Sequence, residues 1–347
     1  MWRYVLKRIG LAFLSTFIIL TLTFILMKLL PFEVLPGTNE DRLKFFTGQV
    51  NMGYVLEFRG PQEGLGDPLF IYKSDNIENV FTYFYKAPVL QQYYSWIKGI
   101  FTEWNWGTST EVHFNISAIT IIAQRLPISM SINVFYIIFS VPLGIVLGII
   151  AALRKNTATD HVISTGIMIA ISIPSFVLIT LMIWIFGWTL EWLPTSWPKD
   201  QASQLDRVLG YIIPVVCLSF GSICGYARST RAELCEILAS DYLLLARTKG
   251  LTKRQAVIRH ALKNAMVPIF PSILAEFLGV FSGSMILEKL YDINGIGGLF
   301  LEALNKKDYN VLLVDMTIFT LFGLLAGVLL DLSYGFLDPR IRMGAKK

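Results

Sequence analysis

The sequence has 347 residues, of which 54% are hydrophobic and only 16% are charged, and its formal net charge is +5. Soluble domains carry about 25% charged residues, so this composition indicates an integral membrane protein rather than a soluble enzyme. The three cysteines, Cys217, Cys224 and Cys235, have no paired spacing, which argues against a disulfide framework and against a zinc site.

Six apolar runs are long enough to cross a bilayer, for which a helix needs roughly 20 apolar residues. Four of them are uncharged, the fifth contains Glu276, and the sixth contains Asp315 and Asp331. We therefore expect an all-α integral membrane protein with six transmembrane helices. In chain order, the runs are Ile9–Met27 (continuing to Leu30), Ile128–Leu153, Val162–Leu190, Val208–Ala227, Ala265–Leu287 and Val311–Leu337.

The first run follows Arg3, Lys7 and Arg8, as the apolar part of a secretory signal peptide would. It is too long for that part, and no small-residue cleavage pattern follows it. We therefore expect residues 1–30 to form a transmembrane helix that is retained in the protein.

Lysine and arginine cluster in four segments that fall on one side of the membrane if six helices alternate in direction. Cytoplasmic loops carry an excess of these residues, so we expect both termini in the cytoplasm and a multi-pass protein of the plasma or inner membrane. The loops expected outside are richer in tryptophan, which favours the membrane interface. The four basic segments are residues 3–8, 154–155, 228–263 and 340–347.

The loop between the first two runs, residues 31–127, is long and of mixed polarity. Loops of this length are usually functional or partly folded. Its final part, residues 114–127, is amphipathic and predicts an interfacial helix that leads into the second span. The remaining residues, 128–342, would form a core with five transmembrane helices.

A basic segment, residues 228–264, interrupts the apolar pattern between the fourth and fifth spans. Ser240 or Asp241 is suited to cap a helix start, and Gly250 is suited to the left-handed position after a helix end. Thr252 and Gln255 have the spacing of a capping box, which predicts a second helix that continues into the fifth span.

Helix, glycine turn and helix also describe a DNA-binding motif, but a recognition helix must be free to enter a major groove. Membrane spans tether this segment at both ends, so we expect no nucleic-acid partner. A loop that only sets topology needs charge and no ordered turn, so the turn signals favour a further role.

The stretch "SDYLLLARTKGLTKRQAVIRHALKNAMVP" (240–268) resembles the cytoplasmic signature loop of ABC-importer permeases in the oligopeptide/dipeptide/nickel branch. The chain is most similar to the first permease of an oligopeptide transporter. The stretches "ILEKLYDINGIGGLFLEALNKKDYNVL" (286–312) and "DLSYGFLDPRIR" (331–342) are also similar to that branch. The resemblance covers residues 1–30 and about 90–342, and the segment 38–90 matches no part of the family.

The resemblance implies the type I ABC-importer permease fold and a second, homologous permease as partner. It further implies two ATP-binding subunits, which bind ATP and magnesium, and an extracytoplasmic peptide-binding protein that delivers oligopeptides. This chain has no G-x-x-x-x-G-K-[ST] phosphate loop, so we expect no cofactor in it and no enzymatic activity of its own. The implied ATPase-coupling residues are Asp241, Tyr242, Ala246, Arg247, Lys249 and Gly250.

An ionisable residue within a span is costly and usually faces a cavity or a partner, which draws attention to Glu276. Glu276 either lines the translocation pathway and meets the amino group of a substrate, or it is a buried carboxyl that stabilises helix packing. The outward loop with Gly295, Gly297 and Gly298 is either part of the translocation entrance or a plain surface turn. The three histidines lie far apart in sequence and give no metal site.

Three alternatives for the function remain open at this point, and one of them is a membrane scaffold or receptor, which would need no docking site for an ATPase. The same machine could import nickel or another small solute instead of peptides. An ion-coupled transporter, which belongs to a different class, would be favoured by inverted repeats, and the sequence contains none that we can detect.

Overall fold

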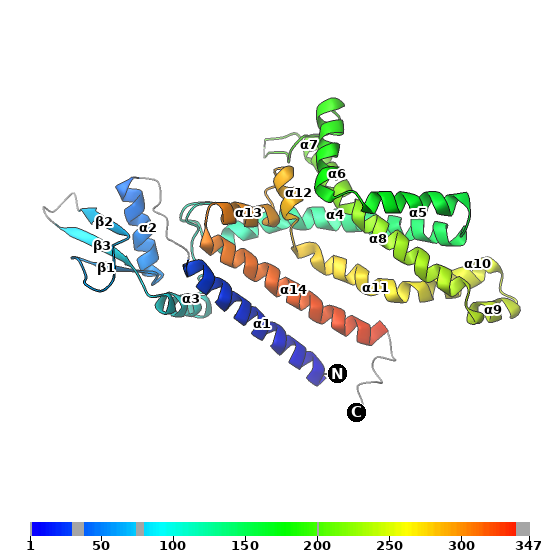
Figure 1. Ribbon diagram of the computed structural model, residues 1–347, viewed down its shortest axis with the longest axis horizontal. Coiled ribbons are helices and arrows are strands. Elements are labelled where there is room, and N and C mark those ends of the chain that lie inside the picture. The colour runs from blue at the N-terminus through cyan, green and yellow to red at the C-terminus, as the bar shows by residue number, and fades with distance from the viewer. Residues whose placement is uncertain (1, 30–37, 74–79, 200, 338–347) are drawn as a thin grey trace. The chain divides into compact units, whose positions relative to one another are not determined.

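The computed structural model describes residues 2–29, 38–73, 80–199 and 201–337, which are mostly helical (Figure 1). The chain divides into two compact units, each built from separate parts of the sequence. The first unit comprises Met1–Ala12, Arg125–Leu299 and Phe319–Lys347, and the second comprises Phe13–Gln124 and Phe300–Ile318.

Within the described residues, five helical segments are long and apolar enough to cross a membrane, and they match five of the six expected spans. Two of these segments begin with shorter helices. Helix α7 (Gln204–Gly210) precedes α8. Helix α10 (Lys253–Ala256) and the π-helical turn η2 (Val257–Ala261) precede α11. The main helices of the five segments are α1 (Trp2–Leu29), α4 (Ala118–Leu153), α8 (Ile212–Leu238), α11 (Leu262–Leu278) and α14 (Tyr309–Leu337).

The third expected span, Val162–Leu190, is not one straight helix. It consists of α5 (Ala158–Ile171) and a second half formed by α6 (Ser175–Met182) and η1 (Ile183–Thr189), with a bend of 96° between the halves. Pro174 lies at the break, where it lacks a backbone donor and disfavours helical geometry at the preceding residue. The count of six spans therefore holds only if the two halves form one broken span.

Helix α4 is 36 residues long, which corresponds to about 54 Å, whereas the hydrocarbon core is about 30 Å thick. The interfacial helix expected over residues 114–127 is not a separate element. Residues 118–127 form the first turns of α4, and the helix continues through Pro127 into the apolar run that follows.

Glycines allow α4 to pack closely on α8. A Cβ atom at Gly144 would lie 2.7 Å from the Cβ of Tyr226, and one at Gly148 would lie 2.6 Å from the carbonyl oxygen of Ala227. Small residues let helix backbones approach each other in membranes, where van der Waals contact drives helix association. A bidentate ion pair, with distances of 2.6 and 2.8 Å between Arg231 and the buried Asp160, joins α8 to α5.

The second unit contains a small sheet that the all-α expectation did not include. It is formed by β1 (Val55–Phe58), β2 (Phe70–Lys73) and β3 (Phe81–Lys86), which pair antiparallel in the order β1-β3-β2. Helix α2 (Asn39–Asn51) covers it through Phe46, whose ring stacks on Phe70 with centroids 5.1 Å apart. Helix α3 (Val89–Glu103) follows the sheet. The segment 38–90, for which the sequence alone predicted no structure, thus contains α2, the three strands and the start of α3.

Asp308, fully buried just before α14, binds the loop that precedes α4. The Ser109 hydroxyl donates to Oδ2 of Asp308 at 2.6 Å, and the backbone N–H groups of Thr110, Glu111 and Val112 donate to the same oxygen at 3.0 Å each. Four donors satisfy the carboxylate without a counter-ion, so Asp308 fixes the path of this loop.

Candidate functional site

The basic segment forms the predicted helix, turn and helix. Helix α9 spans Asp241–Thr248, and Gly250 follows it with φ of +95°, a conformation that side chains with a Cβ rarely adopt. The Thr252–Gln255 capping box is present, with distances of 3.3 and 3.1 Å between each side-chain oxygen and the other residue's backbone nitrogen. Ser240 occupies the position before α9, but its hydroxyl donates to the carbonyl of Ile237 instead of capping the helix.

Helix α9 is held on one face and exposed on the other. Leu243 is buried in a cluster with Ala152, Leu234, Ala256 and residues at the start of α11. Five of the six residues implied in ATPase coupling are exposed, namely Asp241, Tyr242, Arg247, Lys249 and Gly250, whereas Ala246 is half-buried.

Two exposed leucines on α9 complete this surface, and sequence reasoning missed them. Leu244 is 60% exposed and Leu245 is 56% exposed, on a helix that also carries Arg247. Adjacent exposed apolar side chains often mark a protein–protein interaction site. The available signal was the pair of leucines in an otherwise basic, turn-punctuated segment.

Tyr242 connects α9 to α11. The hydroxyl of Tyr242 and the Nδ2 of Asn264 are 3.0 Å apart, with the amide of Asn264 as the donor. Asn264 lies in the first turn of α11, directly after the π-helical turn η2. A side-chain contact therefore joins α9 to α11 in addition to the chain between them.

Glu276 lies on the same helix, α11, and lines a cavity of about 340 Å³ between α8 and α11. Its side chain is half-buried and lies near the side chains of Tyr136 and Tyr226. The lining residues are mostly small or polar, and the site therefore suits a polar solute. They are Ser222, Gly225, Tyr226, Arg228, Ser229, Glu233, Pro268, Ile269, Ser272 and Glu276.

The glycines of the predicted outward loop surround a buried carboxyl group. Glu288, on α12 (Met285–Leu290), is 3% exposed, and its Oε2 accepts the N–H of Gly298 at 2.7 Å. A Cβ atom at Gly295 would lie 2.6 Å from the carboxyl carbon of Glu288, and one at Gly297 would lie 2.9 Å from the backbone nitrogen of Met285. These glycines are required for close approach rather than for a positive φ.

Ser129 completes this contact, since its hydroxyl donates to Oε1 of Glu288 at 2.7 Å and accepts the N–H of Ile296 at 2.9 Å. Burial raises the pKa of Glu288 above its ordinary value, although the hydrogen bonds from Gly298 and Ser129 oppose that shift. Glu288 and Ser129 were not identified from the sequence. The only signal was a glutamate shortly before a glycine-rich loop.

Metal-ligating side chains do not gather in the part of the chain that the structure describes. Within it, no group of three or more histidine, cysteine, aspartate or glutamate residues could hold a metal ion. The three cysteines are free thiols at separate positions, and Cys217 and Cys224 are buried. Nothing in this arrangement indicates bond-making chemistry, whereas an exposed helix and a polar cavity on joined helices are suited to transport.

Comparison with known proteins also indicates a transport protein. Residues 144–343 match the protein family described as binding-protein-dependent transport system inner membrane component. The dipeptide transport system permease protein DppB of Lactococcus lactis subsp. cremoris is 33% identical over 344 residues, which cover 99% of this chain and 100% of that protein. The oligopeptide transport system permease protein OppB of Salmonella typhimurium is 30% identical over 342 residues, which cover 99% and 100%.

The solved structure of the MetNI methionine ABC transporter, in an inward-facing conformation, contains a similar chain. The TM-score is 0.52 at 15% sequence identity, over 63% of this chain and 97% of that one. At this identity the likeness concerns the fold alone, and it confirms the importer-permease fold expected for the helical part. The chain is therefore a multi-pass membrane protein that belongs to the family of binding-protein-dependent transport system inner membrane components.

Proposed function

We propose that the chain is one of two permease subunits of an ATP-driven importer that carries peptides across the cell membrane. Relatives named as dipeptide and oligopeptide permeases match essentially the whole chain, which supports peptides as the cargo. The machine would also contain a second, homologous permease, two ATP-binding subunits that hold ATP and magnesium, and an external peptide-binding protein.

The observation that carries this proposal is the exposed helix α9, followed by the turn at Gly250. A short helix that is seated in a groove of an ATPase subunit transmits a rigid-body movement to the spans attached to it. The apolar side chains of Leu244 and Leu245 would enter the groove, and Arg247 and Lys249 would meet acidic residues at its edge.

In this scheme, the cavity that Glu276 lines is part of the translocation pathway. ATP binding and hydrolysis in the partner subunits would move α9, and the contact between Tyr242 and Asn264 would pass that movement to α11 and to Glu276. The carboxylate of Glu276 would attract the amino group of a peptide.

Reconstitution with the partner subunits tests the proposal. Purified transporter in vesicles should hydrolyse ATP faster when the peptide-loaded binding protein is added outside, and it should accumulate labelled peptide. Uptake of nickel or another small solute with no uptake of peptides would contradict peptides as the cargo. Uptake driven by an ion gradient without ATPase subunits would contradict the importer itself.

A further inference from the structure

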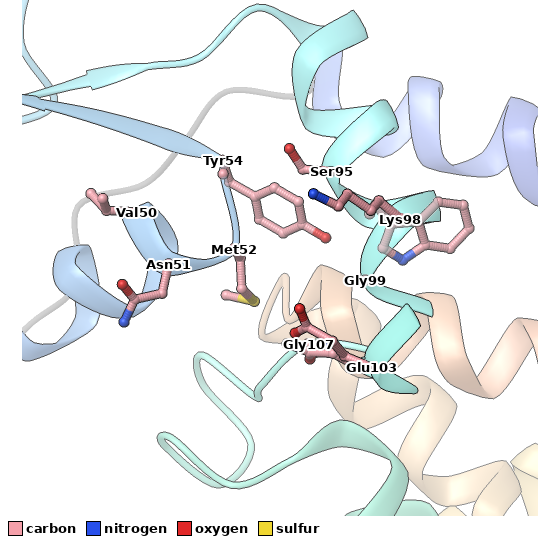
Figure 2. A pocket seen from close by; sticks show the side chains of 12 residues that line it. Val50, Asn51, Met52, Tyr54, Ser95, Lys98, Gly99, Glu103 and Gly107 are labelled. Atoms are coloured by element: carbon pink, nitrogen blue, oxygen red, sulfur yellow. The ribbon is translucent and has the colours of Figure 1, made fainter. Parts of the chain in front are cut away.

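A polar pocket of about 210 Å³ lies in the second unit, between the turn that joins α2 to β1 and the exposed face of α3. Figure 2 shows Tyr54, Lys98 and Glu103 directed into the same space, and in this view the Tyr54 hydroxyl lies between the two charged groups. Gly53 shapes the turn with φ of +73°, and a Cβ atom there would lie 2.9 Å from the Cβ of Ser95. The turn therefore approaches α3 closely enough to form a wall of the pocket.

Three polar groups in this pocket have no partner among the residues that the structure describes. Tyr54 is 4% exposed, and the ammonium nitrogen of Lys28 lies 3.9 Å from the centroid of its ring. The Tyr54 hydroxyl makes no hydrogen bond with the described residues. Lys98 and Glu103 form no ion pair with each other or with other described residues. The Tyr54 hydroxyl opens into the pocket, and Lys98 and Glu103 are exposed, so all three polar groups are available to a ligand.

The spacing of the two charges suits a small zwitterion. Lys98 and Glu103 are five residues apart on α3, which corresponds to about 7.5 Å along the helix axis. Two extended residues of a peptide span up to about 7 Å, so the termini of a dipeptide are separated by a similar distance. The pocket volume of about 210 Å³ is below the roughly 300 Å³ of the smallest pockets for drug-sized ligands, so the pocket suits a small ligand.

We infer that this pocket binds a free dipeptide, with Lys98 on its carboxylate, Glu103 on its ammonium group and the Tyr54 hydroxyl on its central amide. The inference rests on the proposed function, because only the proposed orientation puts the second unit on the side from which peptides arrive. The pocket is then a second, small binding site for cargo, separate from the cavity at Glu276. Its selectivity comes from the two charged termini and not from side chains of the peptide.

The test measures binding of labelled Ala-Ala to the assembled transporter in lipid nanodiscs, without the external binding protein and without ATP. Lys98→Met and Glu103→Gln should each weaken binding by about tenfold, which corresponds to about 1.4 kcal/mol. Tyr54→Phe should weaken it by a smaller factor. The wild-type transporter should bind Ala-Ala more tightly than N-acetyl-Ala-Ala or Ala-Ala amide. Glu103→Gln should abolish the difference in affinity between Ala-Ala and N-acetyl-Ala-Ala. Lys98→Met should abolish the difference in affinity between Ala-Ala and Ala-Ala amide.

Matched controls are Glu57→Gln and Lys73→Met, which remove exposed charges of the same unit outside the pocket and should leave binding unchanged. The inference would be overturned if the wild type showed no saturable binding of Ala-Ala. It would also be overturned if Lys98→Met and Glu103→Gln bound Ala-Ala as tightly as the wild type, or if only Glu276→Gln lost binding. Peptide uptake without binding at this pocket would refute the pocket alone. The proposed function alone would be refuted if the transporter moved no peptide but bound Ala-Ala, with weaker binding in the pocket variants as expected.

Discussion

Tyr242 and Asn264 join the two helices on either side of the Gly250 turn, with 3.0 Å between the tyrosine hydroxyl and the asparagine amide nitrogen. Their positions are 22 residues apart in sequence, and the chain between them contains both the turn and the π-helical turn η2. Irregular helical turns of this kind often lie at functional sites. The hydrogen bond therefore bridges the irregular part of the segment.

Tyr242→Phe removes this hydrogen bond and keeps the ring. A typical net hydrogen bond contributes about 1 kcal/mol, so we expect normal assembly and a lower ratio of peptide uptake to ATP hydrolysis. Asn264→Ala should have the same effect, and the double variant should be no worse than either single one, because all three remove the same interaction. Additive losses in the double variant would show that the two residues act separately.

Gly250→Val forces a β-branched residue into a positive φ, at a cost of roughly 1–2 kcal/mol or more. Membrane insertion should remain normal, whereas docking of the ATPase or its coupling to uptake should fall. Ala246→Asp should act similarly by placing a charge on α9. The measurement is ATP hydrolysis stimulated by the loaded binding protein, together with uptake. Gly250→Asn provides a milder comparison, because asparagine tolerates left-handed geometry, and normal coupling in both damaging variants would refute a docking role.

Glu276→Gln keeps the shape of the side chain and removes its charge. If Glu276 meets substrate, transport of peptides with a free amino terminus should fall more than transport of N-blocked peptides, with assembly unchanged. An equal loss for both peptides, together with poorer assembly, would instead indicate that the contacts to Tyr136 and Tyr226 stabilise helix packing.

The distribution of lysine and arginine predicts the orientation of the chain. Single cysteines at positions 155 and 253 should be protected from an impermeant thiol reagent on intact cells, and single cysteines at 192 and 305 should react. The background must lack Cys217, Cys224 and Cys235. Labelling of position 253 from outside would reverse the proposed orientation.

The buried Glu288 predicts a pH dependence of stability. Burial raises the pKa of Glu288 in the folded state, so the folded protein favours the protonated form. The stability that the protonated carboxyl contributes is fully present below the pKa of glutamate in the unfolded chain, about 4.3. That stability is lost as the pH rises through the pKa of Glu288 in the folded protein. The melting temperature of the wild type should therefore fall relative to that of Glu288→Gln as the pH rises. A constant difference across the range would show that the carboxyl does not titrate there.

The helix, turn and helix of the basic segment, residues 228–264, were predictable because their signals are local. A glycine after a helix and a threonine three residues before a glutamine each specify one turn of backbone, and both features are present at the predicted positions. The bend in the third span was less predictable, since Pro174 was the only interruption in a continuous apolar run.

Contacts between distant residues were not predictable from the sequence. Ser129 and Glu288 are 159 residues apart, and Ser109 and Asp308 are 199 residues apart, so neither pair forms a local pattern. The sheet was missed for a related reason. Its strands have only four to six residues, and each is recognisable only once it pairs with another strand.

The four hydrogen bonds that Asp308 accepts from residues 109–112 have a consequence for biosynthesis. The donors of residues 109–112 emerge from the ribosome long before Asp308, so they remain without this acceptor while almost 200 further residues are made. Domains fold as units during synthesis, at about 5–20 residues per second, so this delay amounts to roughly 10–40 seconds. During that time the nascent chain would expose an unfinished loop to proteases, and the second unit is complete only after Asp308 and the residues up to Ile318 have been made.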